Sequence, residues 1–282
     1  MEDIRVAENC KFITLDNGVQ LPYCEFGEEN DEVIVTGAFY FITFNTFLKA
    51  LAKKYRVIGV IMRMDGDATQ FNEDGTINWT RQWGDDIYQV THKLGIGKFH
   101  FVGKCHGAIP GWYLVKEHPQ ILLSMSSISQ TLHTCGPDSN NWGEGAVKEG
   151  PQFILKALKK HNLLPLKVEE AKTVGTTGTV GARQVDPEIV HYGSYTEEVF
   201  FNSYEQIKEF IPTIKTPVLQ VFATEDIFYW DWKTAHESSF YGIPGARTVL
   251  LQGERHLMEM DMPELLAKEV DFFIERTKMD YE

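Results

Sequence analysis

The stretch "FHFVGKCHGAIPGW" (99–112) decides how the rest of the sequence is interpreted. Its first half, residues 99–104, is predicted to be a strand, and its second half begins a segment of helical periodicity that stops at Pro119. Between them, Gly103 and Gly107 flank Cys105 in the pattern Gly-x-Cys-x-Gly. Glycines allow a sharp strand-to-helix turn without Cβ clashes, so the pattern predicts that Cys105 is presented at the carboxyl end of the strand.

Short β-like runs alternate with helical periodicity on both sides of this stretch, which is the pattern of an α/β sheet. Strands separated by helices predict parallel pairing with right-handed crossovers. An Asn-Gly pair at 17–18, between two β-like runs, predicts an initial hairpin. The expected strands are 11–15, 19–27, 32–37, 56–62, 99–104, 121–129, 216–226 and 246–253, and the expected helices are 44–55, 81–96, 107–119 and 263–278.

The alternation breaks between about residues 131 and 212, where Gly, Thr, Lys and aromatic residues are more frequent. This segment keeps apolar anchors such as Leu155 and Leu158, so we expect an inserted subdomain and not a linker. The chain length of 282 residues fits one α/β domain with an insertion. The predicted organisation is a core of residues 1–130 and 213–282 with a mainly helical cap of residues 131–212.

The charge balance bears on the partners. The chain has 27 Lys and Arg against 40 Asp and Glu, a formal net charge of −13. Nucleic acids and anionic membranes would be repelled, so we expect a small-molecule substrate, no nucleic acid and no membrane, and a homodimer stays open. The N-terminus lacks the features of a secretory signal, and no run approaches the ~18 apolar residues that span a bilayer, so a cytoplasmic protein is expected.

The four cysteines show no metal-like spacing, and no dinucleotide-binding fingerprint is present, so we expect neither a metal nor an organic cofactor. A disulfide between Cys10 and Cys24 is compatible with the sequence, but reduced thiols are favoured for a cytoplasmic protein. The cysteine count therefore gives no independent reason for Cys105, which must be judged by its context.

A thiol nucleophile needs a base, and the base needs an orienting acid. Asp226 closes the strand-like run "TPVLQVFATED", and His256 follows the strand-like run "TVLLQG". Because the carboxyl ends of parallel strands meet at one edge of a sheet, we expect both residues to lie near Cys105. Glu225 is the alternative acid, and His106 is the alternative base.

The order nucleophile, acid, histidine is that of the α/β-hydrolase fold superfamily, which the chain resembles over nearly its whole length outside 131–212. "EVIVTGAFYF" (32–41) resembles the strand and oxyanion loop of that superfamily, and residues 83–119 resemble its helix, strand, nucleophile turn and helix. "TPVLQVFATED" (216–226) resembles the acid strand, and "RHLMEMDMPELL" (255–266) resembles the histidine loop. The resemblance also implies a cap inserted after the sixth strand.

Carried onto this sequence, the resemblance implies that Cys105 is the nucleophile, His256 the base and Asp226 the orienting acid. It also implies an oxyanion hole made by the backbone N–H groups of His106 and Ala38. No cofactor or metal belongs to such a site.

The sequence departs from the superfamily pattern in its cysteine nucleophile, in Thr36 where a histidine is usual, and in a longer, more acidic loop at 63–70. A cysteine forms a thioester intermediate, which water, an amine, an alcohol or a thiol can release. We expect a hydrolase that cleaves an ester, a lactone or a thioester of a small, moderately hydrophobic molecule enclosed under the cap. Acyl transfer or C–C bond hydrolysis at the same site, and a non-catalytic small-molecule receptor, stay open as alternatives.

Overall fold

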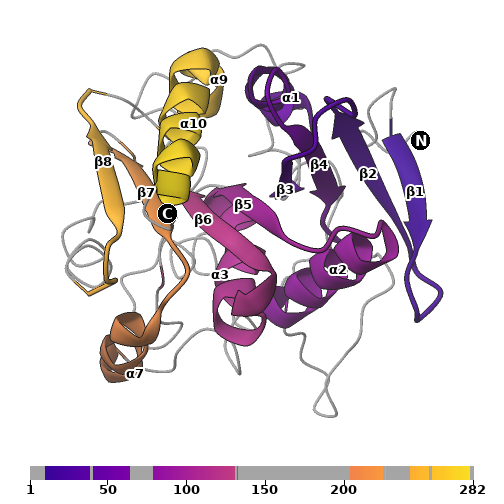
Figure 1. Ribbon diagram of the computed structural model, residues 1–282, viewed down its shortest axis with the longest axis horizontal. Coiled ribbons are helices and arrows are strands. Elements are labelled where there is room, and N and C mark those ends of the chain that lie inside the picture. Colours follow the sequence, from indigo (N-terminus) through magenta and orange to yellow (C-terminus); the bar gives the residue numbers. More distant parts are fainter. Residues whose placement is uncertain are drawn as a thin grey trace, which may run out of the picture.

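The computed structural model describes residues 10–38, 41–63, 79–130, 132, 204–224, 226, 242–253 and 256–279. Within these residues, eight strands form one sheet in the order β1-β2-β4-β3-β5-β6-β7-β8 (Figure 1). The strands are β1 (Cys10–Thr14), β2 (Gln20–Phe26), β3 (Val33–Ala38), β4 (Arg56–Ile61), β5 (Phe99–Lys104), β6 (Leu122–Ile128), β7 (Val218–Ala223) and β8 (Arg247–Leu251).

The pairing of the strands is mostly parallel, as the sequence predicts. Strand β3 pairs in parallel with β4 and β5, and parallel pairing continues through β6, β7 and β8. Antiparallel pairing is confined to β1 with β2 and β2 with β4. The predicted hairpin is confirmed: Gly18 has a φ of +81°, and the Leu15 N–H donates to the Val19 carbonyl at 2.8 Å.

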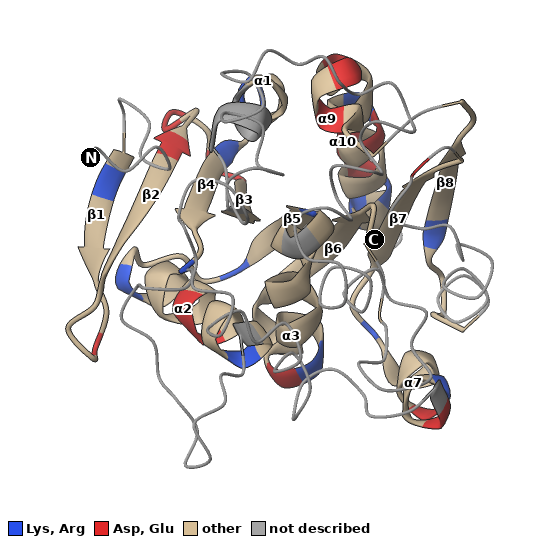
Figure 2. Ribbon diagram, turned by 180° about the vertical axis from the view of Figure 1, so that it is seen from behind, with Lys and Arg blue, Asp and Glu red and all other residues tan. Residues whose placement is uncertain are grey.

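Helices cover both faces of the sheet. The α1–α10 and α1–α9 contacts put these three helices on one face, and α2 packs against α3 on the other face (Figure 1). Most charged residues of the described elements lie on helices and outer strands (Figure 2). Within the described residues, no helix combines the length and the apolar character that crossing a membrane requires. The helices are α1 (Phe41–Leu51), α2 (Trp79–Lys93), α3 (Ile109–Glu117), α7 (Tyr204–Phe210), α9 (Met258–Asp261) and α10 (Pro263–Met279).

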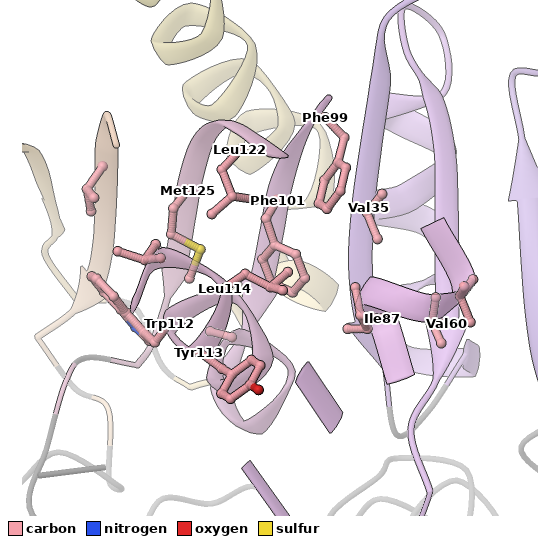
Figure 3. Close-up of a cluster of buried hydrophobic side chains, with 14 of the residues drawn as sticks. Val35, Val60, Ile87, Phe99, Phe101, Trp112, Tyr113, Leu114, Leu122 and Met125 are labelled. Carbon is pink, nitrogen blue, oxygen red and sulfur yellow. The ribbon is translucent and has the colours of Figure 1, made fainter. Parts of the chain in front are cut away.

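Strand β5 lies inside the sheet, between β3 and β6. All six residues of this strand are buried. Phe101 of β5 and Met125 of β6 lie in one apolar cluster with Trp112 and Leu114 of α3 (Figure 3). Each of these four side chains is at most 2% exposed, and Val102 of β5 is buried in the cluster on the other face, so the strand is held on both faces.

The first helix differs from the prediction of 44–55. It ends at Leu51, and the chain turns so that the Tyr55 N–H donates to the Leu51 carbonyl at 3.0 Å. The Tyr55 ring is then buried, and its hydroxyl donates to Asp271 of α10 at 2.6 Å. Apolar spacing alone cannot reveal this turn, because Tyr55 is placed by a contact with a helix more than 200 residues away in the chain.

Most of the predicted cap, 131–212, lies outside the described residues, as do residues 64–70 of the loop predicted at 63–70. In the described part, Leu132, Ile207 and Ile211 are buried in the same cluster as Trp112. These residues belong to the ends of the predicted insertion, where the chain leaves and rejoins the core. The boundaries of the cap stay a prediction.

The thiols of Cys10 and Cys24 face each other across the first hairpin. The two residues are directly opposed in the β1–β2 register, and their Sγ atoms lie 2.7 Å apart as free thiols. Burial, together with the contact to Cys10, raises the pKa of the Cys24 thiol well above its ordinary value. Opposed Cα atoms in antiparallel strands are about 4.5–5.5 Å apart, a separation that a disulfide can bridge.

We therefore expect a mild oxidant such as hydrogen peroxide to join Cys10 to Cys24, with peroxide reduced to water. Peptide mapping should recover the β1–β2 crosslink, with a mass two hydrogen atoms below the sum of the two reduced peptides. Cys24→Ser should abolish the crosslink. Recovery of free Cys10 and Cys24 after oxidation of the folded wild type would contradict the expectation.

Candidate active site

The chain makes a strained turn at Cys105. Strand β5 ends at Lys104, a 3-10 turn covers Cys105–Ala108, and α3 begins at Ile109. Cys105 has a φ of +51°, and Ser129 is the one other described non-glycine residue with a positive φ. This backbone region is costly for a residue with a Cβ, and residues held in it cluster at functional sites. The strand, turn and helix expected from the Gly-x-Cys-x-Gly pattern are all present.

Both glycines of the pattern are required by close contacts. A Cβ on Gly103 would lie 2.3 Å from the Cα of Ala108. A Cβ on Gly107 would lie 2.3 Å from the carbonyl oxygen of Gly37. Real Cβ atoms essentially never approach other atoms so closely, so the turn can pack against the end of β3 only if residue 107 is a glycine.

This approach also places the two backbone segments expected to form the oxyanion hole. Ala38 is the last residue of β3, directly after Gly37, and His106 lies in the 3-10 turn beside Gly107. The 3-10 turn contacts β3. Thr36 is buried inside β3, and its hydroxyl donates to the Gly37 carbonyl at 3.3 Å. Its side chain therefore bonds to the strand's own backbone.

The structure brings the expected base and acid together. Nδ1 of His256 lies 2.9 and 2.8 Å from the two carboxylate oxygens of Asp226. Both side chains are almost fully buried, at 4% and 2% exposure. Asp226 follows β7, and its backbone N–H donates to the Ala223 carbonyl at 3.3 Å. Glu225, the alternative acid, lies outside the described residues.

The charges around His256 favour its protonated form. Burial lowers the pKa of His256, the Asp226 carboxylate raises it, the Lys104 cation lowers it, and a negative charge on Cys105 raises it. Together these effects raise the pKa of His256 from 6.5 to about 9. The histidine is therefore an imidazolium at neutral pH and lies within electrostatic reach of Cys105. This arrangement favours a thiolate on Cys105.

Cys105 also differs from Cys24 in accessibility. Cys105 is partly exposed, whereas Cys24 is fully buried. A reactive cysteine needs both thiolate character and access, and Cys105 has the surroundings for both. The side chain of His106, the alternative base, is not among those described.

Sequence reasoning missed a buried ion pair beside these residues. Nζ of Lys104, the residue before Cys105, lies 2.9 Å from a carboxylate oxygen of Glu259 on α9. The two side chains are 6% and 1% exposed. The one signal in the sequence was a lysine at the end of an otherwise apolar strand, and nothing indicated its partner 155 residues later.

Two further features of this edge of the sheet were also missed. Arg63, just after β4, forms a buried two-contact ion pair with Asp86 of α2, with separations of 2.7 and 2.5 Å. Ser129 follows β6, and its buried hydroxyl has no hydrogen-bond partner within the described part of the chain. No group of three His, Cys, Asp or Glu residues in that part of the chain could hold a metal ion.

The chain matches no protein-family model and no curated protein in sequence. In structure it is similar to an esterase from Rhodococcus sp. ECU1013, with a TM-score of 0.69 and 16% identity over 95% of this chain and 98% of that chain. It is also similar to the enol-lactonase from Burkholderia xenovorans LB400, with a TM-score of 0.67 and 16% identity over 94% and 100% of the two chains. An epoxide hydrolase from Vigna radiata has a TM-score of 0.67 and 17% identity over 95% and 97%. The chain thus has the α/β-hydrolase fold that the sequence predicts.

The raised pKa of His256 predicts how stability depends on pH. A histidine with a folded-state pKa of about 9 binds its proton more tightly than the unfolded chain, whose histidine titrates near 6.5. The stabilisation is complete below pH 6.5 and is lost as the pH rises to about 9. The free energy of unfolding, from urea titrations at pH 6.5 and 9, should therefore fall more in wild type than in His256→Gln.

Asp226→Asn should remove most of the same pH-dependent difference, because it removes the charge that holds the proton. Equal pH dependence in wild type and His256→Gln would show that His256 does not titrate in this range.

Proposed function

We propose that this protein is a hydrolase that cleaves an ester, a lactone or a thioester of a small, moderately hydrophobic molecule through an acyl-Cys105 intermediate. One observation carries the proposal. A buried His256–Asp226 pair, with the pKa of His256 raised to about 9, lies within electrostatic reach of a strained, partly exposed cysteine. A structural cysteine in a tight turn would need neither the imidazolium nor the strain.

In the first half of the proposed reaction, the Cys105 thiolate attacks the carbonyl carbon of the substrate. Negative charge moves to the carbonyl oxygen, where the backbone N–H groups of His106 and Ala38 donate hydrogen bonds to it. One such donor contributes about 3–4 kcal/mol to transition-state stabilisation in a water-excluded site. The carbonyl re-forms as the bond to the leaving group breaks, and the His256 imidazolium gives its proton to the leaving oxygen or sulfur.

In the second half, His256 is neutral and accepts a proton from water as the water attacks the thioester. The thiolate of Cys105 leaves, the acid product departs, and the imidazolium is restored. Because Asp226 accepts from Nδ1, the proton that moves is the one on Nε2. Every proton in this cycle is held by residues of the chain, so the proposed reaction uses no metal and no organic cofactor.

The choice of substrate class has separate support. The similar structures include an esterase, an enol-lactonase and an enzyme that degrades N-acyl homoserine lactone, at 16–18% identity. The predicted cap, 131–212, would enclose a small ligand and explains the preference for a moderately hydrophobic one. Release of the thioester by an amine, an alcohol or a thiol would make the same site an acyltransferase.

Intact mass spectrometry after incubation with activated esters, lactones and thioesters tests the proposal. We expect an acyl adduct on Cys105, with a mass that identifies the acyl half of the substrate. Cys105→Ala should form no adduct and should lose at least about 1000-fold in turnover, as expected when a nucleophile is removed. Adding a competing amine or alcohol separates hydrolysis from acyl transfer through the product that forms.

Alkylation separates this proposal from a non-catalytic receptor. Iodoacetamide near pH 7 should label Cys105 stoichiometrically and should spare Cys24, because burial raises the pKa of the Cys24 thiol. His256→Ala should slow the labelling of Cys105, since the imidazolium that favours its thiolate is gone. Slow labelling of Cys105 that His256→Ala does not change, with full turnover in Cys105→Ala, would overturn the mechanism.

A further inference from the structure

We propose that the buried ion pair of Lys104 and Glu259 is a positioning device for the active site. It fastens the turn that carries Cys105 to the loop that carries His256, and it holds a fixed positive charge beside the histidine. The inference rests on the proposed function, since it assigns a role to residues that support its nucleophile and base.

The pair links the two halves of the site directly. Lys104 is the last residue of β5 and is followed at once by Cys105. Glu259 lies on α9, three residues after His256. The two side chains meet at 2.9 Å although 155 residues separate them in the chain. A shift of either loop would break this contact, so the pair restricts how far Cys105 and His256 can move apart.

Stability alone does not explain the pair. Both charges are taken out of water, and apolar residues of similar volume often serve a fold equally well at such a position. The second carboxylate oxygen of Glu259 is buried without a hydrogen-bond partner among the described residues, which adds to the cost. An apolar side chain is accommodated at the next position of the same short helix, since Met258 is fully buried in the apolar core. The Lys104–Glu259 pair is thus costly for stability, and it lies beside Cys105 and His256, whose relative position the proposed reaction requires.

The position of the positive charge also suits the acid step. Two negative groups act on His256, the Asp226 carboxylate and a charged Cys105, and both hold its proton. Lys104 opposes them and lowers the pKa of His256. A general acid works best when its pKa lies near the working pH, so this cation keeps the imidazolium able to release its proton to the leaving group.

The double variant Lys104→Met/Glu259→Met tests the inference. Replacing both members of a buried ion pair with apolar residues usually preserves the fold, and cooperative thermal unfolding checks that it does. The titration of His256 is followed by NMR of isotope-labelled histidine, which needs no substrate. We expect the His256 midpoint to move up by about one pH unit in the double variant, because Lys104 is among the main groups that shift the pKa of His256 whereas Glu259 is not. The alkaline limb of the pH profile of kcat/KM should move with it.

Two further variants serve as controls. Lys104→Arg keeps the positive charge and should leave the His256 midpoint near that of the wild type. Glu25→Gln/Arg56→Met removes an ion pair of 2.6 Å at the start of β4, away from the carboxyl edge of the sheet. It should move neither the His256 midpoint nor the alkaline limb of the kcat/KM profile. A midpoint unchanged in the folded double variant would overturn the role of Lys104. A shifted midpoint without any acyl adduct on wild-type Cys105 would instead refute the proposed function and leave the electrostatic role standing.

Discussion

The carboxyl edge of this sheet depends on one close approach, that of Gly107 to the carbonyl of Gly37. There is no room for a Cβ at residue 107, since it would lie 2.3 Å from the Gly37 oxygen. The approach allows β5 to pass into α3 through a single strained residue, Cys105, with a φ of +51°. It also puts the backbone after Gly37 beside the turn. The position of Cys105 at the sheet edge and its closeness to a neighbouring strand end therefore arise from the same packing constraint.

Around this constraint, charge is arranged in alternating signs. The Asp226 carboxylate and a negative charge on Cys105 raise the pKa of His256, Lys104 lowers it, and Glu259 pairs with Lys104. These residues come from three separate parts of the chain, the end of β5, the residues after β7 and the residues after β8, so the balance exists only when the sheet is assembled. Low accessibility makes these interactions stronger than they would be in water. A shift of any of these segments would change the charges around His256, so an ion pair that joins two of them, Lys104 with Glu259, would keep the site in place.

Much of the fold could be predicted from local patterns. The glycines around Cys105 indicated the turn, the Asn-Gly pair indicated the hairpin at Gly18, and the run at 99–104 indicated the strand that leads into the turn. Asp226 and His256 could be selected because carboxyl ends of parallel strands share an edge, and the structure places them in contact. The end of the first helix could not be predicted, because the Tyr55 turn depends on Asp271.

Residue order and periodicity determine the sheet class, the turn at Cys105 and the candidates for acid and base, since each follows from short local patterns and their order along the chain. The pairing of Lys104 with Glu259 and the protonated state of His256 were decided only by tertiary structure. The physical reason is that ion pairing and desolvation depend on distance and burial in space. The sequence contains the residues for these effects, but packing decides which of them meet.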